Sequence, residues 1–167
     1  NKGMTELLTA CRQLKNDAVP FTLVIAGKEQ TEGEYLPEFH NGLGENFEYA
    51  GLVSGRRKCD FLRSLDVFVL PSYFEGLPMS LLETMSYGAM PIVTPVGSVP
   101  QVVKDGKNGI FIKAHDSESI VSVVKRFSED RNLLRKLGNA ARSTIFNHFC
   151  SQEYIEKLNR IYAELDR

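Results

Sequence analysis

The sequence predicts an α/β domain with a Rossmann-like, mostly parallel sheet flanked by helices. Short apolar runs alternate with segments of helical spacing over the first two thirds of the chain, and these runs contain few polar residues. Strands of a parallel sheet are covered by helices on both faces, so they appear as nearly continuous apolar runs. After Ile112 only helical patterns follow, which predicts an all-helical C-terminal segment.

Five runs are expected to be the strands of this sheet. They are rich in β-branched and aromatic residues, and glycine or proline closes most of them. The clearest is the run from Asp66 to Pro71. In chain order the runs are 21–27, 47–51, 66–71, 91–95 and 109–112.

The intervening segments carry apolar residues three or four positions apart, which is the spacing of one helix face. Ser151 is a candidate N-cap for the last of these helices. The stripes are Leu7, Leu8, Cys11 and Leu14; Phe61, Leu62 and Leu65; Leu81, Leu82 and Met85; Ile120, Val121, Val124 and Phe127; Leu133, Leu134 and Leu137; and Ile155, Leu158, Ile161 and Leu165.

Size and composition indicate a single soluble domain over residues 1–167. The chain is 43% hydrophobic and 25% charged, and its net charge of −1 gives no support to nucleic-acid binding, which usually needs a basic excess. No apolar run is long enough to span a bilayer. The three cysteines lie far apart and outside any zinc-binding spacing, so we interpret them as reduced thiols in a cytoplasmic protein.

The chain opens directly in a helical pattern, without a strand before it. In a doubly wound sheet ordered 3-2-1-4-5-6, the first strand lies at the centre, between the second and the fourth. The runs at 21–26 and 67–70 are expected to be that second and fourth strand. An upstream segment outside this sequence, another chain, or direct pairing of the two runs would satisfy their backbone groups. We favour the upstream segment, so the two runs should not pair directly.

The loop that follows Leu70 carries the chemistry expected of a ligand site. Ligands of open parallel sheets bind beyond the carboxyl ends of the strands. Gly76 permits close backbone approach, and Pro78 suits the start of a helix, whose free N–H groups favour an anion such as a pyrophosphate. Glu75 precedes this helix and Glu83 lies inside it. Each carboxylate can accept two hydrogen bonds and so hold a vicinal diol. A phosphate position between two such carboxylates outlines a sugar-nucleotide site.

Two glutamates eight residues apart are also common on ordinary helical surfaces, so the surrounding motifs carry the interpretation. The segment from Glu75 to Glu83, followed by 88–93, resembles the E-x7-E signature of the group 1, or family 4, glycosyltransferases. The resemblance covers essentially the whole chain. Its further parts are Lys2-Gly3, Ala26-Gly27, Gly51, 66–72 and 105–109.

This resemblance implies a retaining hexosyltransferase of the GT-B fold, in which two Rossmann-like domains face each other across a cleft. The chain would be the C-terminal, nucleotide-sugar-binding domain, with its first strand and the N-terminal acceptor domain outside this sequence. The full-length enzyme would transfer a hexose from a UDP- or GDP-linked donor to a glycan or lipid acceptor, and the fragment alone would be inactive. No metal or other cofactor is implied. The resemblance leaves peripheral contact with the inner face of the membrane open.

The family also implies roles for individual residues of this sequence. Glu75 would be the catalytic carboxylate beside the donor hexose, and Glu83 would bind the ribose diol. Lys2 would pair with the diphosphate and offset the charge of the leaving group. The remaining donor-binding positions are backbone or packing positions: Gly76, Leu77, Pro78, Met79 and Ser80 around the sugar and distal phosphate, and Leu52 and Val53 around the base.

Some features depart from the family pattern or carry an ordinary structural interpretation. Gln101 stands where the family usually has a glutamate, which removes a charge near the cleft. The segment 56–58 is interpreted as a solvated helix start, and Tyr73 and Phe74 as packing residues. Two other functions stay open: a GT-B sugar-nucleotide epimerase or hydrolase, and a non-catalytic Rossmann-like nucleotide-binding module.

Overall fold

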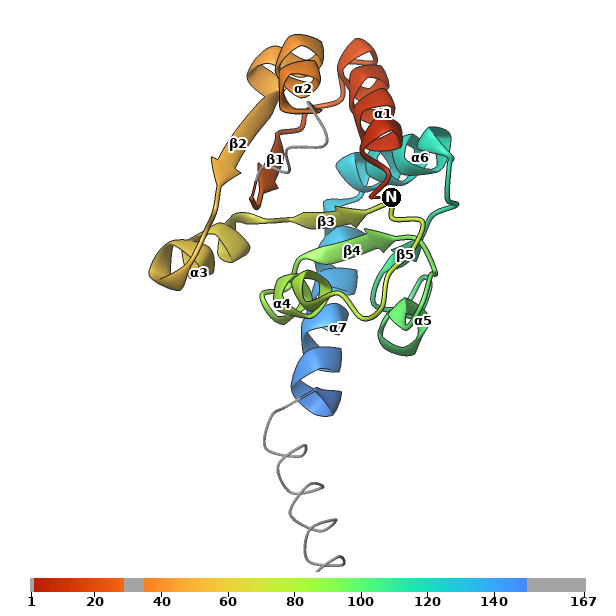
Figure 1. Cartoon of the computed structure of the whole chain (residues 1–167). Coiled ribbons are helices and arrows are strands. Elements are labelled where there is room, and N and C mark those ends of the chain that lie inside the picture. Colours follow the sequence, from red (N-terminus) through yellow and green to blue (C-terminus); the bar gives the residue numbers. More distant parts are fainter. Residues whose placement is uncertain (1, 29–34, 150–167) are drawn as a thin grey trace, which may run out of the picture.

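The computed structural model describes residues 2–28 and 35–149, and shows an α/β fold (Figure 1). The expected last helix and its Ser151 cap lie outside the described residues. The strands are β1 (Leu23–Ala26), β2 (Phe47–Gly51), β3 (Val67–Leu70), β4 (Met90–Val93) and β5 (Ile110–Phe111). The helices are α1 (Met4–Asn16), α2 (Tyr35–Leu43), α3 (Gly55–Ser64), α4 (Met79–Ser86), α5 (Val99–Val102), α6 (Ser117–Glu129) and α7 (Arg131–His148), with a short 3-10 helix, η1 (Gly44–Asn46).

All strand pairs of the described chain are parallel, as predicted, but they form two sheets. β1 pairs with β2, and β3, β4 and β5 pair in that order. β1 and β3 do not pair with each other. This agrees with the expectation that they are the second and fourth strands of a doubly wound sheet, with a position between them.

Helices cover both faces of the β3–β5 sheet. In Figure 1, α1 and α6 lie above this sheet and α4 and α5 below it. The upper layer packs Ala10 and Leu14 of α1 with Ile120 of α6 over Met90 and Ile92 of β4. The lower layer buries Leu81, Met85, Val93, Val99 and Val102. A third cluster joins α1 and α2 to the β1–β2 sheet through Leu7, Leu8, Cys11, Phe39, Leu43 and Phe47.

The helical C-terminal segment is confirmed for α6 and α7, and both helices begin at an aspartate. Asp116 accepts a hydrogen bond from the N–H of Ser119, and Asp130 accepts one from the N–H of Leu133. Each carboxylate therefore satisfies an amide that has no partner within its helix. Asp130 is the single residue between α6 and α7, so the cap of α7 directly follows the end of α6.

The prediction missed α2 and α5. α2 has apolar residues at Leu36, Phe39 and Leu43, which is helical spacing, and the last two are buried. Pro37 and Gly42 lie within the same segment and mask this signal, because neither residue favours a helix interior. α5 is a single turn, too short to show a period.

Candidate functional site

The loop between β3 and α4 is held against the rest of the domain by the turn that follows β4. The hydroxyl of Thr94 donates to the carbonyl of Ser72, and the N–H of Ser98 donates to the carbonyl of Gly76. Gly97 has a φ of +54°, and a β-carbon there would lie 1.9 Å from the carbonyl oxygen of Glu75. Only glycine fits this approach, so the turn fixes the backbone of Glu75 and Gly76. The sequence interpretation did not identify Gly97 or Ser98.

The start of α1 meets the same loop. A β-carbon on Gly3 would lie 2.2 Å from the carbonyl oxygen of Pro71, and its φ is +67°. This close approach brings Lys2 to the loop, where its Nζ lies 2.5 Å from Oε1 of Glu75. The Glu75 side chain is only 10% exposed, whereas that of Lys2 is 59% exposed. The two predicted residues thus meet in an ion pair whose carboxylate is largely withdrawn from water.

A second set of side chains joins the first turn of α1 to this loop. The ring of Tyr73 stacks on His115 with centroids 3.8 Å apart, and Nδ1 of His115 lies 3.7 Å from Oε1 of Glu6. The Tyr73 hydroxyl lowers the pKa of the Glu6 carboxyl, and that carboxyl raises the pKa of Tyr73 to about 12. The two groups therefore lie close enough to shift each other's pKa, although Oε2 of Glu6 is buried and makes no hydrogen bond.

At the other end of the segment from Glu75 to Glu83, the second glutamate is also paired with a lysine. Nζ of Lys58 in α3 lies 2.6 Å from Oε1 of Glu83 in α4, and both side chains are half-exposed. The segment 56–58 does form the start of α3, and Arg56 and Arg57 are exposed as expected, but Lys58 is only half-exposed and its contact with Glu83 was not predicted. The neighbouring Arg57 donates to the carbonyl of Ala50, so it too is engaged with the protein.

Between the two ion pairs, the backbone is open to a ligand. A β-carbon on Gly76 would meet no atom within 4 Å. α4 begins after Pro78, whose side chain provides no cap. In the described part of the chain, the N–H groups of Leu77, Met79 and Ser80 have no hydrogen-bond partner. Uncapped amides at a helix start favour an anion, which fits the predicted phosphate position.

Apolar side chains surround this opening. Leu52 and Phe74 are 71% and 81% exposed, and Leu77 and Met79 are exposed as well. The expectation that Phe74 packs inside the domain is therefore wrong: the ring stands in solvent, while the adjacent Tyr73 supplies the contact with His115. Large exposed apolar groups clustered around a polar site are typical of a binding surface.

Several predicted residues line one cavity of about 750 Å³, namely Leu52, Val53, Ser80 and Glu83. Lys58 lines it too. Lys2 and Glu75 are not among its lining residues and meet at the opposite end of the 75–83 segment. Gln101 is exposed on α5. The structure thus divides the predicted site into an end at Lys2 and Glu75 and an end at Lys58 and Glu83, joined by the open backbone of 76–80.

Comparison with known proteins places the chain in a family. Residues 1–144 match the glycosyl transferases group 1. The chain belongs to this family. Over 98% of its length it is 31% identical to a putative colanic acid biosynthesis glycosyltransferase of Salmonella typhimurium, of which it covers 41%. Over 64% of its length it is 30% identical to the UDP-Gal:alpha-D-GlcNAc-diphosphoundecaprenol alpha-1,3-galactosyltransferase of Escherichia coli, of which it covers 27%.

Solved structures of glycosyltransferases share the fold. Anabaena HepE, solved in complex with UDP-glucose, superposes with a TM-score of 0.84 at 18% identity, over 98% of this chain and 45% of that one. The C-terminal domain of a group 1 glycosyl transferase from Francisella tularensis superposes with a TM-score of 0.78 at 21% identity, over 89% of this chain and 80% of that one. The expected fold of one half of a GT-B glycosyltransferase is confirmed. The chain spans less than half the length of the curated relatives it matches.

Within 2–28 and 35–149, no group of three or more His, Cys, Asp or Glu side chains is placed to hold a metal ion. The metal-free chemistry that the family implies stays a prediction. No helix in the described part of this glycosyltransferase chain is long and apolar enough to cross a membrane.

Proposed function

We propose that this chain binds the donor of a retaining, family 4-type hexosyltransferase, which transfers a hexose from a nucleotide-diphospho-sugar to an acceptor. The observation that carries the proposal is the segment from Glu75 to Glu83. It has one lysine–glutamate pair at each end and an uncapped, unobstructed helix start between them. This order of groups matches the order of hexose, diphosphate and ribose in a donor.

In this proposal each part of the donor meets a complementary group. The free N–H groups of Leu77, Met79 and Ser80 and the Lys2 ammonium bind the diphosphate. Oε2 of Glu83 accepts from the ribose diol, because Oε1 is occupied by Lys58. Leu52 and Val53 contact the base. A uridine or guanosine donor fits this arrangement, and the UDP-glucose complex of HepE and the UDP-Gal substrate named for the Escherichia coli relative support uridine.

The proposed reaction breaks the bond between the anomeric carbon and the diphosphate oxygen. Positive charge develops on the sugar, and the withdrawn carboxylate of Glu75 stabilises it more strongly than an exposed one would. Negative charge develops on the diphosphate, where Lys2 and the start of α4 offset it. The acceptor hydroxyl oxygen then bonds to the anomeric carbon on the face that the diphosphate leaves and gives its proton to the departing diphosphate, so the configuration is retained.

The acceptor is proposed to be a glycan or a lipid-linked glycan, bound through an N-terminal domain. The names of the two relatives, one for colanic acid biosynthesis and one for a diphosphoundecaprenol-linked sugar, support this class. We place the full-length enzyme in the cytoplasm, with peripheral contact at the inner face of the membrane.

Thermal denaturation with UDP, GDP, ADP and their sugar conjugates tests donor binding, because a ligand that binds only the native state raises Tm. We expect UDP or GDP and its conjugate to raise Tm, and Glu83→Ala to abolish most of the shift. Glu129→Ala, at an exposed position in α6, is the matched control and should keep it. No shift with any nucleotide would contradict the proposal. Donor binding without transfer by the full-length protein would favour the non-catalytic module.

A further inference from the structure

The segment 73–75, which carries the proposed catalytic carboxylate, has little support from its own backbone. The carbonyls on either side of it, those of Ser72 and Gly76, accept hydrogen bonds from the turn after β4. In the described part of the chain, no hydrogen bond holds the backbone of 73–75 itself. The close contact with Gly97 blocks movement toward that turn but does not resist movement away from it. The position of the segment therefore depends on its side chains.

The three side chains of this segment differ in what they contact. Phe74 stands in solvent and is 81% exposed. Glu75 pairs with Lys2, an exposed side chain that the proposed reaction also assigns to the diphosphate. Lysine is a point charge on a flexible stem, so a lysine shared between two anions holds neither of them in one place. Tyr73 is the remaining side chain that can anchor the segment.

Tyr73 is contacted from two other elements of the fold. Its ring stacks on His115, with the centroids 3.8 Å apart and the planes at 26°. Its hydroxyl lies beside Glu6 in the first turn of α1, and this carboxyl raises the pKa of Tyr73 to about 12. Nδ1 of His115 lies 3.7 Å from Oε1 of Glu6, whose side chain is only 16% exposed. Each of the three side chains therefore touches the other two.

His115 keeps its place in this group against backbone strain. Its φ is +58°, in the left-handed region that residues with a β-carbon rarely adopt. Such a conformation persists where the surrounding contacts determine it. The next residue, Asp116, caps α6, and α6 is joined to α1 by an ion pair of 2.8 Å between Lys125 and Asp17. His115 is therefore presented by an element that is already fixed relative to α1.

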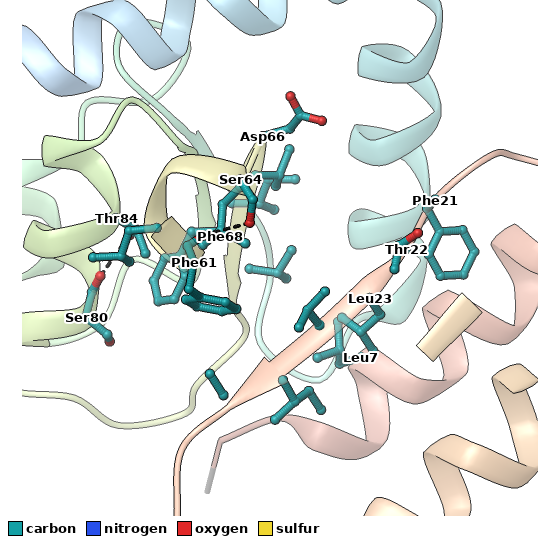
Figure 2. A pocket seen from close by; sticks show the side chains of 18 of the residues that line it. Leu7, Phe21, Thr22, Leu23, Phe61, Ser64, Asp66, Phe68, Ser80 and Thr84 are labelled. Atoms are coloured by element: carbon teal, nitrogen blue, oxygen red, sulfur yellow. Dashed lines mark hydrogen bonds between the residues drawn. The ribbon is translucent and has the colours of Figure 1, made fainter. Parts of the chain in front are cut away.

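Direct packing between α1 and β3 is incomplete beside this group. Figure 2 shows Leu7, the residue after Glu6, on one side of the 750 Å³ cavity and Phe68 of β3 on the other. The contacts that Lys2 and Glu6 make beyond the end of β3 therefore matter for how α1 and the following loop are placed relative to each other.

We infer that Glu6, Tyr73 and His115, here called the Tyr73 clamp, are positioning residues for Glu75. Glu6 and His115 hold Tyr73, and Tyr73 holds the segment 73–75 when Lys2 turns from Glu75 to the diphosphate. Because Glu75 is taken to stabilise charge on the sugar, this role rests on the proposed function. A displacement of about 1 Å at a reacting group can cost up to about a hundredfold in rate. The clamp therefore acts on the transfer step and leaves the affinity for the nucleotide unchanged.

His115→Gly separates positioning from general support of the fold. Glycine adopts a positive φ freely, so this substitution removes the ring and the backbone strain together. Ala18→Gly is the matched control. Ala18 also has a positive φ, of +55°, and follows the end of α1 that is opposite to Glu6. His115→Phe is the conservative variant, because it keeps a ring against Tyr73.

NMR relaxation of the backbone amides of 73–76 in the 167-residue chain gives the structural result. In His115→Gly the order parameters of these amides should fall from about 0.85, typical of rigid backbone, toward values below about 0.6. Ala18→Gly should leave them as they are, and His115→Phe should keep most of the rigidity. Unchanged order parameters in His115→Gly would overturn the inference.

Steady-state kinetics of the full-length enzyme gives the functional result. His115→Gly should lower kcat by about tenfold or more, with the affinity for UDP and GDP within about twofold of the unmodified enzyme. His115→Phe should restore most of kcat, and Ala18→Gly should not change it. If His115→Gly does not fold, Glu6→Gln takes its place with the same expected split, because it keeps the size of the side chain and removes the charge beside the Tyr73 hydroxyl.

Four kinetic results would overturn the inference. Unchanged kcat in His115→Gly would mean that the clamp does not act on Glu75. An equal loss in Ala18→Gly would assign the effect to added backbone freedom. An equal loss in His115→Phe would mean that the stacked ring does not hold Tyr73. A loss of nucleotide affinity in parallel with kcat would place His115 in contact with the nucleotide.

Failure of the proposed function gives a different pattern. If the unmodified full-length enzyme transfers no sugar, or Glu75→Gln keeps near-normal turnover, Glu75 is not the catalytic carboxylate. The order parameters of 73–76 in the 167-residue chain then decide by themselves whether the Tyr73 clamp positions Glu75.

Discussion

Gly97 and Glu75 touch through their backbones, so closely that a β-carbon on Gly97 would lie 1.9 Å from the Glu75 carbonyl oxygen. The turn after β4 therefore contacts the loop that carries the proposed catalytic carboxylate. Glu75 is held from one side by this turn and from the other by Lys2. Its position therefore depends on two contacts with residues far from it in the sequence.

We predict that Gly97→Ala lowers the free energy of unfolding by about 2–4 kcal/mol, because it adds this collision to the strain of a positive φ. Gly106→Ala is the matched control. Gly106 has a φ of +68°, but a β-carbon there meets no atom within 4 Å, so strain alone should cost about 1 kcal/mol. Urea unfolding of both variants measures the difference. Equal costs would show that the contact with Glu75 is easily relaxed.

Glu83→Ala should weaken nucleotide binding by roughly 1–3 kcal/mol through the loss of charge-assisted hydrogen bonds to ribose. Lys58→Met should weaken it less, because Lys58 holds Glu83 in place rather than contacting the diol. Calorimetric titration of both single variants and the double variant gives the coupling between the two residues. Unchanged affinity of Glu83→Ala for both UDP and GDP would remove Glu83 from the site.

Glu75→Gln in the full-length enzyme should depress kcat far more than it weakens binding of the nucleotide product. The negative charge matters most when the anomeric carbon becomes electron-poor, so its loss is felt mainly in the transition state. Steady-state kinetics at saturating donor, with product affinity measured alongside, separates the two effects. Near-normal turnover would refute the catalytic assignment.

Stability should fall at high pH through Tyr73. Its pKa is raised from 10 to about 12 in the folded protein by the neighbouring Glu6, so the native state holds a proton that the unfolded state has released. The loss therefore develops as the pH rises from about 10 towards 12. Tyr73→Phe should flatten the profile in this window.

The same contact predicts a change at low pH. The pKa of Glu6 is lowered by Tyr73, so its contribution is present above the ordinary value of 4.5 and is lost as the pH falls below it. The midpoint of urea unfolding, measured across both pH windows, tests Tyr73→Phe. Tyr49→Phe is the control for losing a tyrosine hydroxyl. A wild-type profile in Tyr73→Phe would mean that the Glu6–Tyr73 contact does not exist in solution.

Local sequence was sufficient for the strands and for most helices, because burial on both faces of a parallel sheet leaves a continuous apolar run. The run 66–71 contains β3, and the stripe Leu7, Leu8, Cys11 and Leu14 is the buried face of α1. α2 was not predicted because Pro37 and Gly42 interrupt its apolar stripe. The doubly wound order also predicted from sequence that β1 and β3 would not pair.

The candidate site likewise has residues that the local sequence indicates and residues that it does not. Glu75, Glu83 and the glycine–proline segment between them lie on one continuous stretch, so this stretch and its resemblance to the family motif were enough to propose them. Lys58, Gly97 and the group of Glu6, Tyr73 and His115 were not identified.

What they share is that each acts on a residue of another element. Lys58 is 25 residues from Glu83, and Lys2 is 73 residues from Glu75. The sequence by itself determined the fold class, the strands and most of the helices, because periodicity and turn chemistry are local properties, and its resemblance to the family proposed the residues of the donor motif. Only the tertiary structure decided which lysine meets which carboxylate, that Phe74 faces solvent, and that β1 and β3 border a common cavity. These depend on how separate elements pack, and the spacing within one element does not encode that.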